Sequence, residues 1–353
     1  MPAPPLSAAD RAQAVAARAL LALPPAVQRR IAGGAPIVRD GLTLDPEVQL
    51  VLRLLEQAGD PPLDELTPAA ARAQISHDAA LFAGPAIPVA DVQALTVAGA
   101  AGPLAARRYV PAGFAAPGPT LVYFHGGGWV VGDLDTHDQT CRLMARHSGA
   151  AVVAVDYRLA PEHPFPAPVD DALAAFRDVA ARAAELGADP ARIGVGGDSA
   201  GGHLSAVTSL LAAGDGGPAP AFQLLIYPVT DSAEEHRSYE LFADGFFLTR
   251  RDMHWYQGHF LPPGTDLRDP RVSPLHAADV SGVAPAFVVT AGFDPLRDEG
   301  EAYAARLREA GVRTVLRRQA GLIHGFVNMA GMGRAGREAT LELAGALQVG
   351  LAG

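Results

Sequence analysis

The chain has 353 residues, 49% of them hydrophobic and 19% charged, which suits one large globular domain with an elaboration or two modest domains. The net charge of −10 argues against a general surface for nucleic acids or anionic membranes. A single cysteine, Cys141, excludes an intramolecular disulfide and a cysteine-cluster metal site. The chain has no apolar run long enough to span a membrane and no early positive region typical of a signal peptide, so we expect a soluble cytoplasmic protein.

The N-terminal part of the chain carries helix signals. Asp45-Pro46 is a good cap and first-turn pair for a helix over 46–58, which ends before Gly59. Thr67-Pro68 has the same role for a second helix over 68–84. We therefore expect residues 1–90 to form a helical segment.

From about residue 93, short apolar runs alternate with longer helical stretches. Strands are predicted at 93–99, 104–110, 120–124, 151–156, 192–197, 222–227, 286–292 and 313–318. Helices are predicted at 136–148, 170–186, 200–213, 298–310 and 335–349. This alternation indicates an α/β fold with a mostly parallel sheet covered on both faces. The interval 231–283 breaks the rhythm and is rich in aromatic residues, which suits a lid over a site at the strand ends.

The stretch Gly197-Asp198-Ser199-Ala200-Gly201 matches G-x-S-x-G between a predicted strand and a predicted helix. A sharp strand-to-helix turn lifts the serine hydroxyl above the sheet, and the flanking glycines avoid collisions with neighbouring elements. The glycine spacing fits neither a dinucleotide fingerprint nor a P-loop. A plain glycine turn is the alternative, which the strand before and the helix after make less favoured. We interpret Ser199 as a nucleophile.

A second glycine-rich stretch, His-Gly-Gly-Gly at 125–128, follows the predicted strand 120–124. Its backbone N–H groups can point into a cavity and stabilise the oxyanion of a tetrahedral intermediate. A tight turn without a ligand is the alternative. The serine motif downstream favours the oxyanion loop.

A serine nucleophile needs a base within hydrogen-bond reach and a carboxylate that holds this base. The chain has 11 histidines, among which His125 opens the glycine-rich loop, His163 lies in PEHPFPA and His203 lies on the helix after the serine. His324 follows the last predicted strand and has Gly321 and Gly325 as small neighbours, so it can reach a site above the sheet. We assign His324 as the base.

Three aspartates are candidates for the acid. Asp294 follows Phe293, the residue after the predicted strand 286–292, so we expect it at the carboxyl end of a strand. We assign Asp294 as the acid. Asp298 suits a helix start and is the fallback. Asp198 is rejected, because the side chain before the nucleophile leaves the turn in another direction. The order Ser199, Asp294, His324 is the order expected of an α/β-hydrolase.

The motifs YFHGGGWVVGD, VDYRLAPEHPFPA, GGDSAGG, DPLRDEG and HGF span residues 123–326 in this order. With them the chain resembles the hormone-sensitive lipase-like (family IV) carboxylesterases of the α/β-hydrolase superfamily, from about residue 42 onward. The resemblance implies an α/β-hydrolase fold with a mostly parallel, eight-stranded sheet in a catalytic domain over 91–353. It also implies a helical cap from residues 1–90 and the insertion at about 231–283. The role of the first 40 or so residues stays open.

The resemblance carries the triad onto Ser199, Asp294 and His324, and the oxyanion donors onto the backbone N–H groups of Gly127, Gly128 and Ala200. Family members cleave short- to medium-chain acyl esters without a metal or an organic cofactor, and many are homodimers. The resemblance therefore implies a small-molecule ester as substrate. Four apolar side chains are candidates for the acyl pocket, with a plain core role equally open for each: Trp129, Phe246, Phe247 and Leu248.

Two other functions stay open. An amidase or an arylformamidase would use the same triad, because the leaving-group preference depends on the pocket. A non-catalytic small-molecule receptor is the less favoured alternative, because related plant hormone receptors can lose the catalytic base and His324 is present here.

Overall fold

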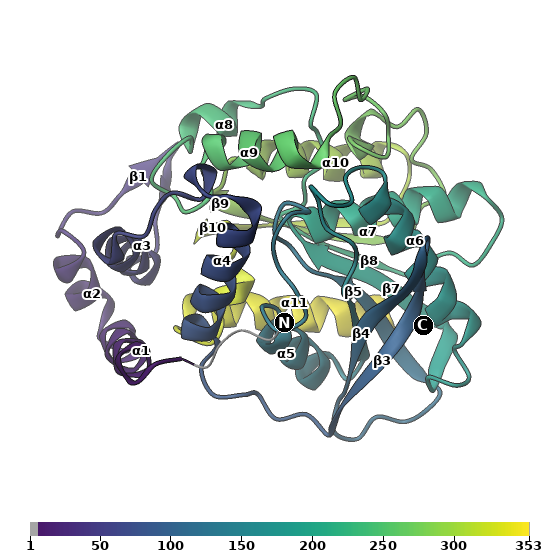
Figure 1. Ribbon diagram of the computed structural model, residues 1–353, viewed down its shortest axis with the longest axis horizontal. Coiled ribbons are helices and arrows are strands. Elements are labelled where there is room, and N and C mark those ends of the chain that lie inside the picture. The colour runs from purple at the N-terminus through teal and green to yellow at the C-terminus, as the bar shows by residue number, and fades with distance from the viewer. Residues whose placement is uncertain (1–5, 353) are drawn as a thin grey trace.

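A single large sheet organises the protein (Figure 1). The computed structural model describes residues 6–352. Its eight-stranded sheet has the order β10-β9-β8-β7-β5-β6-β4-β3, in which the β3–β4 and β4–β6 pairs are antiparallel and the others are parallel. The strands are β3 (Asp91–Gly99), β4 (Gly102–Val110), β5 (Gly118–Phe124), β6 (Ala151–Val155), β7 (Ala188–Asp198), β8 (Gln223–Ile226), β9 (Ala286–Phe293) and β10 (Thr314–Ile323).

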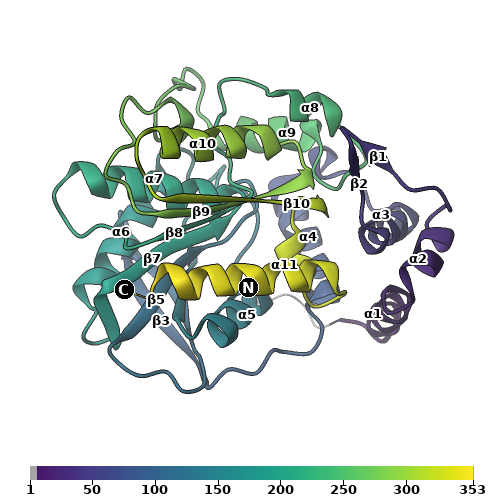
Figure 2. The same cartoon turned by 180° about the vertical axis from the view of Figure 1, so that it is seen from behind.

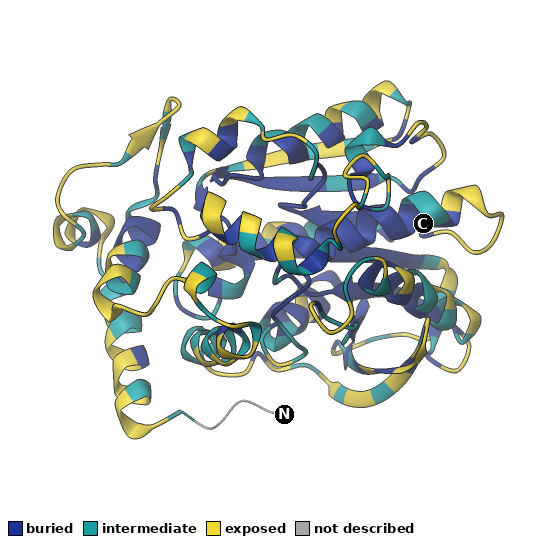
Figure 3. Cartoon of the chain, turned by 45° about the horizontal axis from the view of Figure 1, so that its top comes forward, coloured by how far each residue is buried: buried dark blue, intermediate teal, exposed yellow. Residues whose placement is uncertain are grey.

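Helices cover both faces of this sheet, as the alternating side chains of its central strand require. In β5, Leu121 and Tyr123 belong to one hydrophobic core and Val122 and Phe124 to another. Two helices pack on the first core, namely α5 (Asp138–Ser148) and α11 (Ala335–Gly350). The opposite face carries α6 (Ala167–Ala181), α7 (Ala200–Gly214) and α10 (Arg297–Glu309). The central strands β5, β6, β8 and β9 are therefore almost completely buried (Figure 3).

The N-terminal segment lies beside the sheet and forms a separate layer of helices (Figures 1 and 2). Helix α4 lies between the sheet and the outer elements, which precede it in the chain. The segment consists of α1 (Ala8–Leu21), α2 (Pro25–Ile31), the hairpin of β1 (Val38–Arg39) and β2 (Leu42–Thr43), α3 (Pro46–Ala58), a short 3-10 helix η1 (Leu63–Glu65) and α4 (Pro68–Ala83).

The insertion after β8 holds two further helices on the side of the sheet where the N-terminal segment lies (Figure 1). They are α8 (Arg237–Leu241) and α9 (Arg250–Phe260). Thr249 caps α9 through a reciprocal capping box with Asp252, which explains where this helix begins. Two short 3-10 helices complete the elements, η2 (Pro274–His276) and η3 (Phe326–Met329). Within residues 6–352, no helix has the length and apolar character that crossing a bilayer requires.

Most predicted elements agree with the structure, and the deviations lie at their ends. Helix α3 has the predicted bounds, with Asp45 accepting a hydrogen bond from the backbone N–H of Glu47. Strand β10 is longer than predicted and runs through Ile323, because Gln319 and Ile323 still pair with Ala291 and Phe293 of β9 across a register shift. Helix α6 starts before and ends before the predicted 170–186, and turns fill the remainder.

Candidate active site

Ser199 lies at a sharp turn between β7 and α7. Its φ of 56° is in the left-handed region, which is rare for a residue with a side chain and is typical of strained functional turns. The turn requires glycine on both sides. A Cβ on Gly197 or on Gly201 would overlap the carbonyl oxygen of Phe124 at the end of β5. The packing of β7 and α7 against β5 therefore explains the glycines of the motif.

Three side chains from the ends of three strands form a hydrogen-bonded chain. His324 Nε2 is 2.9 Å from Ser199 Oγ, and His324 Nδ1 is 2.8 Å from Asp294 Oδ2. Because a carboxylate only accepts, Nδ1 carries the proton and Nε2 offers its lone pair to the serine hydroxyl. All three side chains are buried, and the second oxygen of Asp294 accepts from the backbone N–H of Leu296. This arrangement can move a proton from the serine to the imidazole.

The other residues considered as base or acid take no part in the hydrogen bonds that link Ser199, His324 and Asp294. Asp298 is hydrogen-bonded to Ser238 and to Arg297, next to α8. His125 donates to the carbonyl of Gly126, and burial lowers its pKa to about 4. His203 is described below, and His163 is exposed in a loop. In the described part of the protein, His324 is the one residue that forms a hydrogen bond with the Ser199 hydroxyl.

The glycine-rich loop after β5 lies against the same turn. Gly127 and Gly128 have φ angles of 118° and 56°. A Cβ on Gly128 would overlap the ring of Tyr256 on α9, so this position has room for glycine alone. Within residues 6–352, no protein group accepts a hydrogen bond from the N–H of Gly127 or Gly128. Ala200 is the first residue of α7, where a helix leaves N–H groups without an internal partner.

Asp198 holds this loop in place, a role that the sequence analysis did not assign. Its Oδ1 accepts from the hydroxyl of Tyr123 at 2.7 Å and from the backbone N–H of Gly126 at 3.0 Å, and it lies 3.2 Å from His137 Nε2. Burial alone would raise the pKa of Asp198, but His137 and these hydrogen bonds lower it to about 2. The carboxylate is thus ionised and makes no contact with His324.

Trp129, which follows the loop, joins it to the insertion. Its indole stacks on Phe260 of α9 with the ring centroids 4.1 Å apart, and its Nε1 donates to His203 Nδ1 at 3.2 Å. Burial lowers the pKa of His203 to about 4, so this imidazole is neutral and its Nε2–H donates to the carbonyl of Arg271. The indole is completely buried, so its side chain has a core role although the residue borders the cavity.

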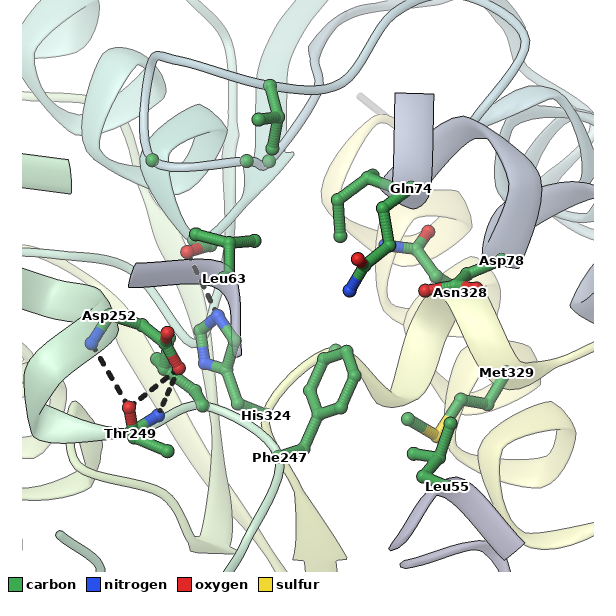
Figure 4. A pocket seen from close by; sticks show the side chains of 18 of the residues that line it. Leu55, Leu63, Gln74, Asp78, Phe247, Thr249, Asp252, His324, Asn328 and Met329 are labelled. Carbon is green, nitrogen blue, oxygen red and sulfur yellow. Dashed lines mark hydrogen bonds between the residues drawn. The ribbon is translucent and has the colours of Figure 1, made fainter. Parts of the chain in front are cut away.

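A cavity of about 660 Å³ opens above Ser199 and His324 (Figure 4). Its walls come from four parts of the chain, namely the glycine-rich loop, the insertion with α9, the N-terminal segment and the stretch after β10 that contains η3. Leu55, Leu63 and Met329 point toward it as apolar groups, and Gln74 and Asp78 add a polar side (Figure 4). The N-terminal share of this wall was not foreseen in residue detail, because helix patterning does not tell which face meets the cavity.

The neighbouring residues Phe246 and Phe247 of the insertion have different surroundings. Phe247 and Leu248 border the cavity, and the ring of Phe247 lies over Gly325 beside His324. Phe246 points the other way, into the core, where its ring lies 5.3 Å from that of Phe293. Phe247 has a positive φ of 75° between these two differently directed side chains. Of the four expected pocket residues, Phe246 is the one that does not border the cavity.

Comparisons with known proteins agree with this architecture. The family model described as alpha/beta hydrolase fold matches residues 121–328. The carboxylic ester hydrolase LipN of Mycobacterium tuberculosis is 46% identical, over 93% of this chain and 89% of that protein. The ethyl acetate hydrolase of Pseudomonas putida is 37% identical, over 87% of this chain and 99% of that one.

Solved structures extend the match to three dimensions. An ester hydrolase from the metagenome of Lake Arreo has a TM-score of 0.85 and 46% identity, covering 88% of this chain and 100% of that chain. A thermostable esterase from Pseudomonas putida has a TM-score of 0.82 and 38% identity, covering 86% and 96% respectively. The chain therefore belongs to the hormone-sensitive lipase-like (family IV) carboxylic ester hydrolases of the α/β-hydrolase superfamily.

Proposed function

We propose that the protein hydrolyses short- to medium-chain acyl esters through an acyl-enzyme intermediate, with Ser199 as nucleophile, His324 as base and Asp294 as the acid of the triad. The contact chain from Ser199 through His324 to Asp294, with distances of 2.9 and 2.8 Å, is the observation that carries this proposal. Its distances and its burial are those of a serine activated by a neighbouring base.

In the first half of the reaction, Ser199 Oγ attacks the ester carbonyl carbon while His324 Nε2 takes the hydroxyl proton. The carbonyl oxygen becomes an oxyanion, which the backbone N–H groups of Gly127, Gly128 and Ala200 stabilise. The tetrahedral intermediate collapses, the bond to the leaving alcohol breaks, and the imidazolium gives its proton to the departing oxygen. Asp294 stabilises the imidazolium that exists between these steps.

In the second half, water replaces the alcohol. His324 takes a proton from water, whose oxygen attacks the acyl carbon and forms a second tetrahedral intermediate at the same oxyanion site. Collapse breaks the bond to Ser199 Oγ, the proton returns to this oxygen, and the carboxylic acid leaves. The chain's own groups supply each proton transfer of this cycle.

The cavity supports a small ester with an apolar chain as the substrate. Leu248 and Met253 from the insertion and Leu55 and Met329 from other elements border it. Apolar walls favour hydrocarbon chains by about 0.8 kcal/mol per buried methylene group. The ethyl acetate hydrolase among the relatives supports the same class of substrate.

The direct test is hydrolysis of p-nitrophenyl esters by the wild type and by Ser199→Ala. We expect the variant to lose on the order of 10⁴-fold or more in kcat, because the nucleophile is gone while the oxyanion donors remain. Ser281→Ala, in an exposed loop of the same protein, is the matched control and should retain wild-type kcat. A fluorophosphonate probe should label the wild type and the control, but not Ser199→Ala. Equal turnover by Ser199→Ala in a clean preparation would contradict the proposal.

A panel of esters and amides with equal acyl groups separates this function from an amidase or an arylformamidase with the same triad. We expect the ester of each pair to be cleaved with the higher kcat/KM. Higher kcat/KM for the amides would favour the alternative. The homodimer and the cytoplasmic location stay predictions from the sequence, and light scattering after size-exclusion chromatography measures the first.

A further inference from the structure

The stretch between α2 and α3 contributes to the cavity above Ser199. Ala32 and Ile37 border the same cavity as Ser199 and His324, together with Leu52 and Leu55 of α3. These four residues are called the outer wall here, because α2 and α3 lie beyond α4 as seen from the sheet (Figures 1 and 2). Half of the outer wall thus comes from the first 40 or so residues, whose role the sequence left open.

Hydrogen bonds fix this stretch against α3. The side chain of Gln49 donates to the carbonyl of Ala35 at 2.8 Å, and the backbone N–H of Leu44 donates to the carbonyl of Ile37 at 2.9 Å. Gln49 itself is buried. The backbone around Ile37 is therefore held on both sides, and its side chain has a defined place in the wall.

The hairpin that follows Ile37 is anchored to the body of the protein. Asp40, at its tip, lies 2.9 Å from Arg297 of α10 and 3.0 Å from Arg237 of α8. The Arg297 side chain is buried, so this ion pair joins the hairpin to the helix that follows Asp294. The backbone N–H of Asp45 also donates to the carbonyl of Gly321 on the last strand. These contacts tie the outer wall to the elements that carry Asp294 and His324.

The chemistry of the outer wall suits a hydrocarbon chain. Its members are all apolar, and Phe82 of α4 and Met329 beside it extend the apolar surface. The charged side chains at its border, Arg53 and Glu56, pair with each other at 2.5 Å and are exposed. Each methylene group that an apolar wall removes from water adds about threefold to fourfold in affinity. A wall that leaves no room for further methylene groups therefore ends this increase in affinity with the length of the hydrocarbon chain.

We propose that the outer wall sets the maximum length of the apolar chain of the ester, and that Ile37 is a specificity-determining residue in it. The proposal rests on the ester hydrolysis proposed above. It gives the N-terminal segment a function in substrate selection. The apolar chain can be the acyl chain, which is bonded to the carbon that Ser199 attacks, or the alkyl chain of the alcohol, which is joined to this carbon through the ester oxygen.

The test compares Ile37→Trp with Val38→Trp. Val38 is the next residue, is 50% exposed and does not border the cavity, so it is a matched control for the same substitution. Two ester series are used, p-nitrophenyl esters with acyl chains of two to twelve carbons and acetates of alcohols of two to ten carbons. We expect Ile37→Trp to lose about tenfold or more in kcat/KM for the longest chains accepted by the wild type in one series. The shortest esters should change by less than about twofold.

A second variant works in the opposite direction. Ile37→Ala removes bulk from the wall, so the chain length with the highest kcat/KM should move to longer chains in the same series. Thermal unfolding of each variant shows whether it is folded. If Ile37→Trp does not fold, Ile37→Ala alone decides, and an unchanged length profile in that variant overturns the proposal. Equal profiles for folded Ile37→Trp and Val38→Trp in both series also overturn it.

Binding of 2-alkanones, ester analogues that cannot be hydrolysed, separates this inference from the proposed function. Calorimetric titration with ketones of five to eleven carbons should show an affinity that rises with chain length in the wild type and stops rising earlier in Ile37→Trp. This result without hydrolysis of any ester supports the wall and contradicts the esterase. If the protein hydrolyses esters but the wild type and Ile37→Trp show the same dependence of ketone affinity on chain length, the proposed function is supported and the proposed role of the outer wall is contradicted.

Discussion

Asp198 accepts a hydrogen bond from the backbone N–H of Gly126 at 3.0 Å, so the residue before the nucleophile holds the loop that supplies two of the proposed oxyanion donors. The carboxylate lies next to the serine in sequence but takes no part in the contact chain to His324. It links β7 to the loop after β5, with Tyr123 and His137 as its other partners. Its contribution to catalysis is therefore expected to be positional.

The first prediction concerns this carboxylate. In Asp198→Asn, an amide replaces an ionised group that is paired with His137, and the hold on Gly126 weakens. We expect kcat to fall on the order of 10- to 100-fold with a small change in KM, because a displaced oxyanion loop acts on the transition state. Tyr123→Phe removes one hydrogen bond and keeps the charge, so it should cost less. Wild-type kcat in a folded Asp198→Asn protein would count against this role.

The second prediction separates the two neighbouring acids after β9. Asp294→Asn should lower kcat on the order of 10⁴-fold, because an amide no longer stabilises the imidazolium or selects the tautomer with the proton on Nδ1. Asp298→Asn keeps the triad contacts and should change kcat less than about threefold, with a lower Tm from the weakened contacts to Ser238 and Arg297. Steady-state kinetics of both variants measures the difference. The reverse ranking would make Asp298 the acid.

The third prediction concerns the contact between the glycine-rich loop and the insertion. A Cβ in Gly128→Ala would overlap Tyr256, and alanine disfavours the φ of 56° found here. We expect a loss of about 100-fold or more in kcat from the displaced loop. The double variant Gly128→Ala/Tyr256→Ala relieves the overlap and should recover part of the lost activity. No recovery would mean that the backbone conformation alone causes the loss.

The fourth prediction is a pH dependence of stability at the base of the insertion. Asp231 lies 3.0 Å from both His236 and His276. The hydrogen bond between His236 and Asp231 raises the pKa of His236 above 6.5. Burial alone would raise the pKa of Asp231, but the hydrogen bonds from His236, the backbone N–H of Ala233 and His276 lower it to about 2.

The signs of these shifts define the pH range. The stabilisation from His236 is complete below its unfolded pKa of 6.5 and is lost as the pH rises through its higher folded pKa. The stabilisation from Asp231 is present above its unfolded pKa of 3.8 and is lost as the pH falls toward about 2. Both act between these unfolded values. His236→Gln should therefore lower the free energy of unfolding by about 0.5–1 kcal/mol near pH 5.5, as for a partly exposed ion pair. Denaturation at pH 5.5 and 8.5 should give a smaller difference at the higher pH, and equal differences would contradict the assignment.

By itself, the sequence determined the α/β order of elements, the turn at Ser199 and the position of His324 after the last strand, because each is written in local patterns of caps, apolar runs and glycines. The same local reasoning left three acids to weigh and a core role open for each apolar residue beside the site. Only the tertiary structure showed that Phe246 packs in the core while Phe247 borders the cavity, and that Asp198 holds the glycine-rich loop. These contacts join residues from different elements, so local patterns do not reveal them. The outer wall was the least predictable feature, because Ile37 lies in a connecting stretch whose residues do not specify which surface of the protein the segment covers.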